Sequence, residues 1–125
     1  MVSAAALSAA RKAIESAYTG HCDIIERCSV RDEKTKITRQ SEKVVIHNQP
    51  CRLSFERLSA AGQTETAAKI TQGLKLFIAP EVDVKSGSKI VVEQNGVKTE
   101  CVAGGEPAVY FSHQEIMLEL FKEWA

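Results

Sequence analysis

The sequence lacks the signals of several common protein classes. It has only seven aromatic residues, and 16 basic and 16 acidic side chains give a formal net charge of zero. A strong general attraction to nucleic acid or to an anionic membrane is therefore not expected. No stretch approaches transmembrane length, and residues 1–18 lack the basic segment and continuous apolar run of a signal peptide. We therefore expect a protein made in a reducing cytoplasm.

Groups that usually perform catalysis are scattered. The three histidines have no serine or cysteine nucleophile beside them in a recognised arrangement. Cys51 and His113 would form a nucleophile and base if folding brought them together, but Cys51 lies on a predicted inward face, which favours a structural thiol. Gly104 and Gly105 are not followed by the lysine of a phosphate-binding loop. The sequence predicts no enzyme.

The four cysteines do not have the spacing of a metal site. Five residues separate Cys22 from Cys28, whereas zinc ligands usually come in pairs two to four residues apart, and Cys51 and Cys101 stand alone. An even number of cysteines would suggest two disulfides in a secreted protein. In a cytoplasmic chain we expect free thiols that pack as small apolar side chains. No metal and no cofactor is predicted.

The first twenty residues predict a helix in front of a β domain. Ser3 can cap a helix whose face carries Leu7, Ile14 and Tyr18, and Gly20 is placed to end it. Alanine and serine dominate this segment, so helix propensity is high but little apolar surface can be buried. We expect the helix to pack either as a flap on its own barrel or on a neighbouring molecule. The chain is one domain, with the helix in 1–20 and the barrel in 21–125.

Short alternations of apolar and polar residues, broken by turn signals, fill the rest of the chain. Asn95 and Gly96 give the clearest hairpin signal, and Pro50 marks a bend. The segment after Ser112 reads both as a capped helix and as a strand, and we choose the strand because it would close the sheet. The predicted fold is mainly β: a small closed or nearly closed antiparallel β-barrel. The expected strands are 23–30, 43–47, 51–57, 74–79, 89–94, 97–102 and 116–121.

Two polar segments interrupt this pattern. Residues 31–40 are almost all charged or polar, which indicates a solvated hairpin arm or loop that serves solvation or docking. Residues 58–71 are small and polar and can bury little, so we expect a long loop between strands. Ordered loops of this length are uncommon and often functional, and disorder is the alternative.

Several short runs, in this order and spacing, resemble the small head-closure proteins of tailed phages and prophages of Gram-positive bacteria, also called head-tail connector, head-completion or stopper proteins. The resemblance covers residues 23–124, and none of the motifs is chemically diagnostic by itself. The runs are Gln49-Pro50-Cys51-Arg52-Leu53-Ser54, 74–80, Ser86-Gly87-Ser88-Lys89-Ile90, Gly105-Glu106-Pro107-Ala108-Val109-Tyr110 and His113-Gln114-Glu115.

The resemblance implies a virion protein that forms a homo-oligomeric ring at the head-tail junction. Such a ring sits beneath the portal and adaptor proteins, closes the filled head and receives the tail-terminator protein. One loop per subunit can hold packaged double-stranded DNA in the channel without sequence specificity, and 58–71 matches it by position. The residues concerned are Gln63, Thr64, Glu65, Thr66 and Lys69 for the channel loop. The resemblance does not include the first helix. From the apolar stripe of that helix and the charges of 31–40, we expect contacts between subunits or with neighbours at Leu7, Ile14, Lys34, Lys36 and Arg39.

Other functions remain open at this stage. A tail-terminator or adaptor ring of the same junction would share the barrel architecture, so the sequence does not distinguish it from a head-closure ring. A nucleic-acid-binding small barrel is a different class, but no predicted strand shows the aromatic-basic-aromatic face that single strands require. We expect no membrane partner and no small-molecule substrate.

Overall fold

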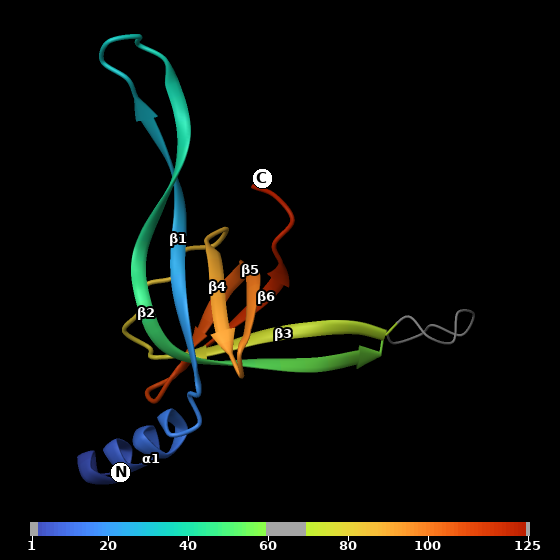
Figure 1. Ribbon diagram of the computed structural model, residues 1–125. Coiled ribbons are helices and arrows are strands. Elements are labelled where there is room, and N and C mark those ends of the chain that lie inside the picture. The colour runs from blue at the N-terminus through green and yellow to red at the C-terminus, as the bar shows by residue number, and fades with distance from the viewer. Residues whose placement is uncertain (1–2, 60–69, 125) are drawn as a thin grey trace.

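A helix precedes six antiparallel strands that close into a barrel in the computed structural model of the chain (Figure 1). The structure describes residues 3–59 and 70–124. The elements are α1 (Ala4–Glu15), β1 (Gly20–Arg31), β2 (Thr38–Ser59), β3 (Ile70–Ile78), β4 (Lys89–Gln94), β5 (Val97–Val109) and β6 (Gln114–Leu120).

Closure of the barrel depends on two pairings between strands that are distant in the sequence. The strand order is β1-β2-β3-β6-β5-β4, and β4 pairs back onto β1. The final strand, β6, pairs with β3 on one side and β5 on the other. The predicted closed barrel and the choice of a strand after Ser112 are therefore confirmed. Closure leaves none of these strands with an open edge inside the barrel.

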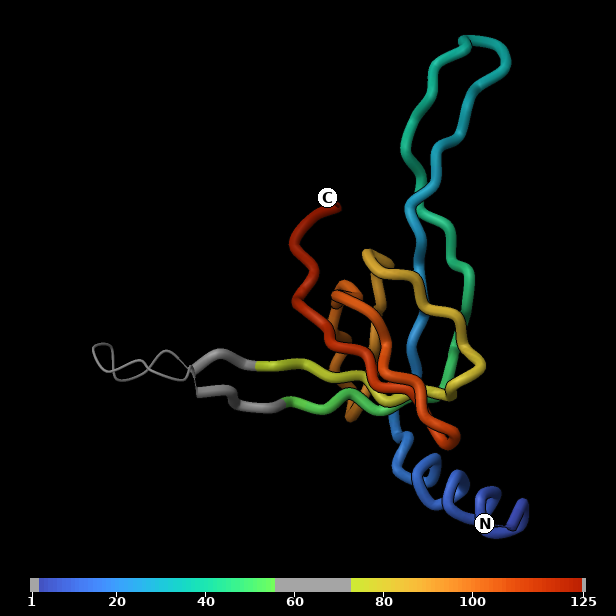
Figure 2. Tube along the Cα trace, turned by 180° about the vertical axis from the view of Figure 1, so that it is seen from behind, coloured from blue at the N-terminus to red at the C-terminus, as the bar shows by residue number. Residues whose placement is uncertain are grey.

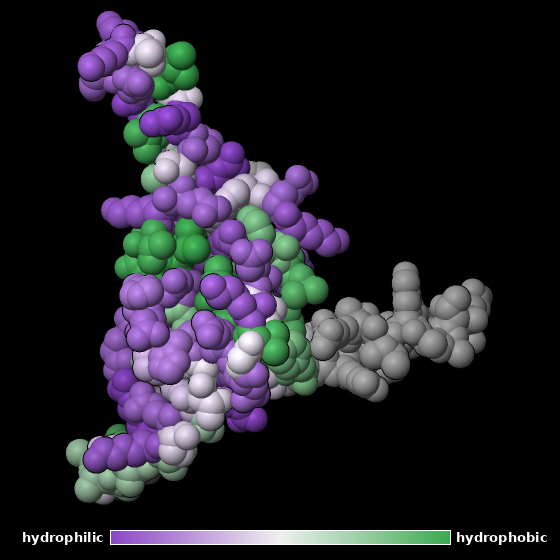
Figure 3. All heavy atoms as spheres, in the orientation of Figure 1, coloured by the Kyte–Doolittle hydropathy of each residue, from purple (hydrophilic) through white to green (hydrophobic). Residues whose placement is uncertain are grey.

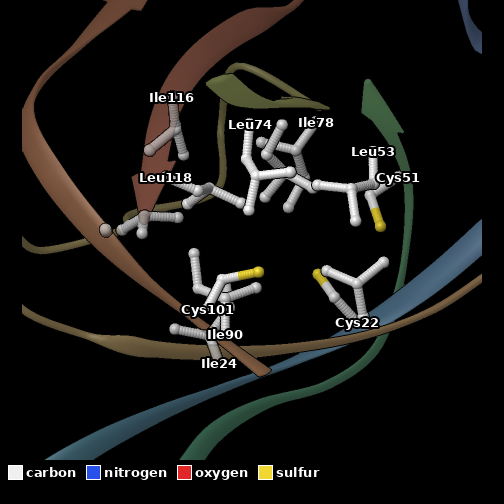
Figure 4. Close-up of a cluster of buried hydrophobic side chains, with 14 residues drawn as sticks. Cys22, Ile24, Cys51, Leu53, Leu74, Ile78, Ile90, Cys101, Ile116 and Leu118 are labelled. Carbon is white, nitrogen blue, oxygen red and sulfur yellow. The ribbon is translucent and has the colours of Figure 1, made fainter. Parts of the chain in front are cut away.

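The core fills the barrel interior. Alternate residues of every strand point inward, among them Cys22, Ile24, Leu76 and Ile90, which are 0–1% exposed. Figure 4 shows Cys22, Cys51 and Cys101 among the apolar side chains of this cluster. All four cysteines are free thiols, and only Cys28 lies outside the core. The inward position predicted for Cys51 is confirmed.

Strand β2 differs from the prediction of two strands separated by a bend at Pro50. It is one 22-residue strand with a local kink. Asn48 has a positive φ of 55°, and its backbone N–H donates to Oδ1 of Asp23 (2.9 Å), which also contacts His47 Nδ1 (2.9 Å). Pairing with β3 begins only at Cys51, so β2 has a free edge at Pro50, where a missing N–H costs no ladder bond.

Helix α1 begins as predicted and ends earlier. The Ser3 side chain caps it by accepting from the Ala6 N–H, but the helix ends at Glu15 and Gly20 is already the first residue of β1. A Cβ at Gly20 would lie 3.0–3.2 Å from atoms of Gln94 and Glu93, so close packing, not helix termination, requires this glycine. No helix within the described residues is long and apolar enough to cross a bilayer.

Two long hairpins project from the barrel in different directions (Figures 1 and 2). The first is the β1–β2 arm, whose paired strands extend to Arg31 and Thr38 and confirm a hairpin arm at 31–40. The second is formed by β2 and β3, which remain paired as far as Ser59 and Ile70. The expected loop 58–71 is therefore too long at both ends, because the backbone pairing of β2 with β3 continues to Ser59 and Ile70.

Candidate assembly surfaces

The β1–β2 arm carries three of the residues implicated in contacts between subunits. Lys34 and Lys36 lie in the turn at its tip, and Arg39 lies on the adjacent part of β2, paired with Val30. The turn is well defined by backbone hydrogen bonds. The Asp32 N–H donates to the Ile37 carbonyl (3.0 Å), and the Asp32 carbonyl accepts from the Lys36 N–H (2.7 Å). Oδ1 of Asp32 also accepts from the N–H of Lys34 (2.8 Å). The basic side chains are thus presented on an ordered tip.

Most of this arm is surrounded by solvent. Every residue in 29–43 is exposed, including Val30 (42%) and Ile37 (64%). Figure 3 shows a mainly hydrophilic arm with apolar residues scattered along it. An isolated two-stranded hairpin is marginally stable in water, and residues 29–43 of this arm have no packed face of their own.

The base of the arm is fixed to the barrel by the C-terminal segment. The Trp124 indole N–H donates to Glu42 on β2 (3.0 Å), and Lys89 on β4 lies 3.5 Å from Glu42 and 3.6 Å from Glu100. Lys89 also lies over the Phe121 ring, 4.5 Å from its centroid. The Trp124 hydrogen bond, together with Lys89, lowers the pKa of Glu42. These contacts hold the arm in a defined direction from the barrel.

Two surface hollows flank Trp124 at this junction. One of about 310 Å³ is lined by Lys85, Ser86 and Gly87, and the other of about 250 Å³ by Gln40 and Ser41. Arg27 and Trp124 line both. They are gaps between the arm, the C-terminal segment and the turn before β4, and they belong to the same junction.

Helix α1 carries Leu7 and Ile14, the other two implicated contacts. Both side chains are half-buried, and no residue of the helix is fully buried. The Arg11 guanidinium joins the helix to the segment after β3 through a paired contact with Glu81, in which Nη2 lies 2.8 Å from Oε2. This contact lowers the pKa of Glu81. The helix therefore lacks the buried apolar face of a flap packed on its own barrel.

The predicted channel loop cannot be placed in the same way. Gln63, Thr64, Glu65, Thr66 and Lys69 lie outside the described residues. The described parts of the second arm are the strands β2 and β3, which are paired as far as Ser59 and Ile70.

A column of stacked groups crosses the outside of the barrel, and the sequence did not reveal it. Arg52 on β2 lies over the Phe77 ring on β3 (5.9 Å), Phe77 neighbours His113 (5.8 Å) and His113 stacks on Tyr110 (5.0 Å). His113 Nε2 lies 2.8 Å from the Glu115 carboxylate, and this contact is the main reason that the pKa of Glu115 is lowered. Only the His113 and Tyr110 rings are stacked, the Phe77 ring is tilted by 34° to His113, and Tyr110 remains 50% exposed.

The structure does not unite the catalytic pair considered from the sequence. His113 contacts Ser112 and Glu115 on the outer surface, whereas Cys51 is buried in the core. The neighbouring Cys51 and burial raise the pKa of the Cys22 thiol, and burial raises the pKa of Cys101 to about 11. These two thiols are protonated at neutral pH. Within residues 3–59 and 70–124, no group of three or more histidine, cysteine or acidic side chains could hold a metal ion.

Comparison with known proteins gives one distant likeness. No family model matches the chain, and no curated protein matches it. A solved structure described as the phage-like element PBSX protein xkdH from Bacillus subtilis shares 10% sequence identity with it, at a TM-score of 0.49. The alignment covers 80% of this chain and 91% of that chain. A likeness this distant carries no argument about function.

Proposed function

We propose that the chain is a structural virion protein of the head-tail interface of a tailed phage or prophage. In this role it forms a ring beneath the portal and adaptor proteins, closes the DNA-filled head and provides the docking site for the tail. The support is the resemblance of residues 23–124 to head-closure proteins and a fold that suits the role. The chain is made in the host cytoplasm and acts in the virion.

The observation that carries this proposal is the exposed β1–β2 arm. Its tip is ordered by the Asp32 turn, its base is fixed through Glu42, and its residues 29–43 have no packed face. A rigid projection that buries nothing in its own chain suits a protein whose partners are other proteins. A closed ring also needs two different, complementary surfaces on each subunit, and an arm and a barrel face provide them.

The second arm supplies a means of holding DNA. Strands β2 and β3 remain paired as far as Ser59 and Ile70 in a projection from the barrel, and copies of this projection in a ring of subunits would meet around one axis. A zero net charge suits this task, because DNA gripped by a strongly basic ring would be difficult to release. The proposal requires no catalysis, cofactor, small-molecule substrate or membrane.

Electron microscopy of particles made without this gene tests the proposal. Deletion from the phage or prophage that encodes the chain should give free tails beside heads that have lost their DNA, and a plasmid copy should restore joined virions. Normal joined virions without the chain would refute a role at the junction. Assignment of the protein to purified filled heads or to free tails then distinguishes head closure from a tail-terminator ring.

A further inference from the structure

The zero net charge conceals an uneven distribution of charge. Between Arg27 and Lys43, the β1–β2 arm has six basic and three acidic side chains. From residue 79 to the end, the chain has eight carboxylates and four lysines. The basic excess therefore lies on the arm, and the acidic excess lies on the half of the barrel that contains β4, β5 and β6.

Part of the acidic excess lies on one outer face. Glu93 on β4, Glu100 on β5 and Glu119 on β6 alternate with buried neighbours, so all three point away from the core. All three residues are exposed, as is Met117 (47%) on the same face of β6. Two lysines share this face: Lys89 on β4 is only 12% exposed and lies between Glu42 and Glu100, and the exposed Lys98 on β5 pairs with Glu93. The three carboxylates outnumber the two lysines, so the face keeps an acidic excess. We call the exposed surface around Glu93, Glu100 and Glu119 the acidic face.

The arm of a given chain is not free to lie on its own acidic face. Its base is held by the Trp124–Glu42 hydrogen bond and by the ion pair of Glu42 with Lys89. Beyond this point, the outer part of the arm, residues 30–39, is exposed and points away from the barrel (Figures 1 and 2). A basic tip and an acidic face in one chain that do not meet each other are available to a second copy.

We propose that the β1–β2 arm of one copy docks on the acidic face of the next. Lys34, Lys36 and Arg39 would lie near the three carboxylates. This inference rests on the proposed function, because it names the contact between subunits of the ring. Arm and face are different surfaces, so the contact is heterologous and repeats from copy to copy until the ring closes.

Apolar contacts complete the interface. Charge pairs between exposed side chains set register and partner choice more than affinity. Val30 and Ile37 on the arm are exposed apolar side chains, and Met117 offers an apolar counterpart on the acidic face. We therefore expect Ile37 to provide binding energy and the basic residues to provide direction. Because the charges are exposed, salt should weaken the contact.

Site-specific photo-crosslinking tests the contact directly. A photoreactive phenylalanine replaces Lys36 in the full chain, and isotope-labelled and unlabelled copies are mixed at high concentration and low salt, so that crosslinks between copies can be recognised by mass spectrometry. We expect such crosslinks in peptides of β4, β5 or β6. Absence of crosslinks between copies, or crosslinks mapped to α1 or to β2 and β3, would overturn the proposal.

Charge reversal provides a second test with rescue. The double variant Lys34→Glu, Lys36→Glu should reduce the yield of crosslinks from a photoreactive residue at Ile37 by about tenfold. Glu93→Lys with Glu119→Lys in the partner copy should restore it. Lys12→Glu on exposed α1 makes the same type of charge change elsewhere and should leave the yield unchanged. If the crosslink yield falls and the lysine substitutions in the partner copy do not restore it, direct pairing of these charges would be refuted.

The outcome separates this inference from the function on which it rests. If deletion of the gene releases DNA but crosslinks map elsewhere, the ring stands and this interface is wrong. If crosslinks reach the acidic face but virions without the chain are normal, the chain assembles through this contact in another setting.

Discussion

At the residue scale, His113 is a group whose effect can be measured at a neighbouring carboxylate. Its Nε2 lies 2.8 Å from Glu115, and Lys75 lies 3.2 Å from the same side chain. Both contacts lower the pKa of Glu115 from its ordinary value of 4.5, and the His113 contact contributes most. A lowered folded-state pKa stabilises the protein above the ordinary value, and this contribution is lost as the pH falls through the folded-state pKa.

We predict that His113→Phe raises the pKa of Glu115 towards its ordinary value. Phenylalanine keeps a ring between Phe77 and Tyr110 but removes the nitrogen that contacts the carboxylate. Carbon-detected NMR titration of the Glu115 carboxyl group measures the change. The stability difference between wild type and variant should narrow as the pH falls below 4.5. An unchanged pKa would show that Lys75 alone controls this group.

Asn48 is the second residue with a defined local role. Its φ of 55° lies in the left-handed region, which asparagine and glycine tolerate better than other residues. Asn48→Ala should lower the free energy of unfolding by about 1 kcal/mol, while Asn48→Gly should cost less. Urea denaturation of the three proteins checks this order. Equal stability of the alanine and glycine variants would mean that the kink in β2 carries no backbone strain.

At the element scale, the β1–β2 arm should be dispensable for folding and required for assembly. Cys28 pairs with Ser41, so residues 29–40 can be replaced by Asn-Gly, which joins the two strands in a tight turn. The deleted residues contribute nothing to the core. We predict a free energy of unfolding within about 1 kcal/mol of the wild type, because surface changes cost little. Urea denaturation measures stability, and the trimmed gene should fail to restore joined virions.

A control variant with a full-length arm shows whether assembly depends on the length of the arm or on its charges. The variant with Lys34, Lys36 and Arg39 all replaced by glutamine keeps the arm and should weaken assembly less than trimming does. Loss of folding in the trimmed protein would show that the arm is part of the cooperative unit. Normal virions with the trimmed gene would remove the arm from the mechanism.

The second arm can be tested through the segment that it carries. Replacement of Gln63-Thr64-Glu65-Thr66 by a shorter linker should leave folding intact and allow packaged DNA to leak from heads. Circular dichroism checks the fold, and the fraction of DNA-filled heads after storage measures the leak. Stable retention of DNA would exclude this segment from the closure mechanism.

Local signals predicted most elements but not their full extent. Asn95-Gly96 specified the β4–β5 hairpin, and alternation in 116–121 together with the need for closure specified β6, which the structure places at Gln114–Leu120. The continuity of β2 was missed because Pro50 normally interrupts a strand, and the free edge that tolerates it exists only in the folded sheet. Gly20 was misread because the close approach of Gln94 is a tertiary contact.

The candidate surfaces were likewise predictable where a local pattern of residues marks them, and not where they depend on tertiary contacts. The polar run 31–40 identified the arm, because a segment with so many charges cannot enter the core. The Trp124–Glu42 contact joins residues 82 positions apart, and the stacked column joins Arg52, Phe77, His113 and Tyr110 from across the barrel. Contacts between residues so far apart leave no periodic pattern in the sequence, so neither could be predicted from it.

At the scale of the whole molecule, the chain is a small closed barrel from which a helix and two hairpins project. The core lies inside the strands, while α1 and residues 29–43 of the arm have no buried residue. Ordered projections of this kind carry a cost in conformational entropy that their own contacts do not offset. Contacts with other copies and with neighbouring proteins in a virion would supply the missing stabilisation.

The central claim is that copies of this chain form a ring at the head-tail junction, and cryo-electron microscopy of the neck of intact particles tests it most directly. The account predicts a closed ring of six-stranded barrels below the portal, with one arm of each copy on the next barrel and the β2–β3 hairpins directed towards the channel. A neck reconstruction with every density assigned to other proteins, and no copy of this chain, would contradict it.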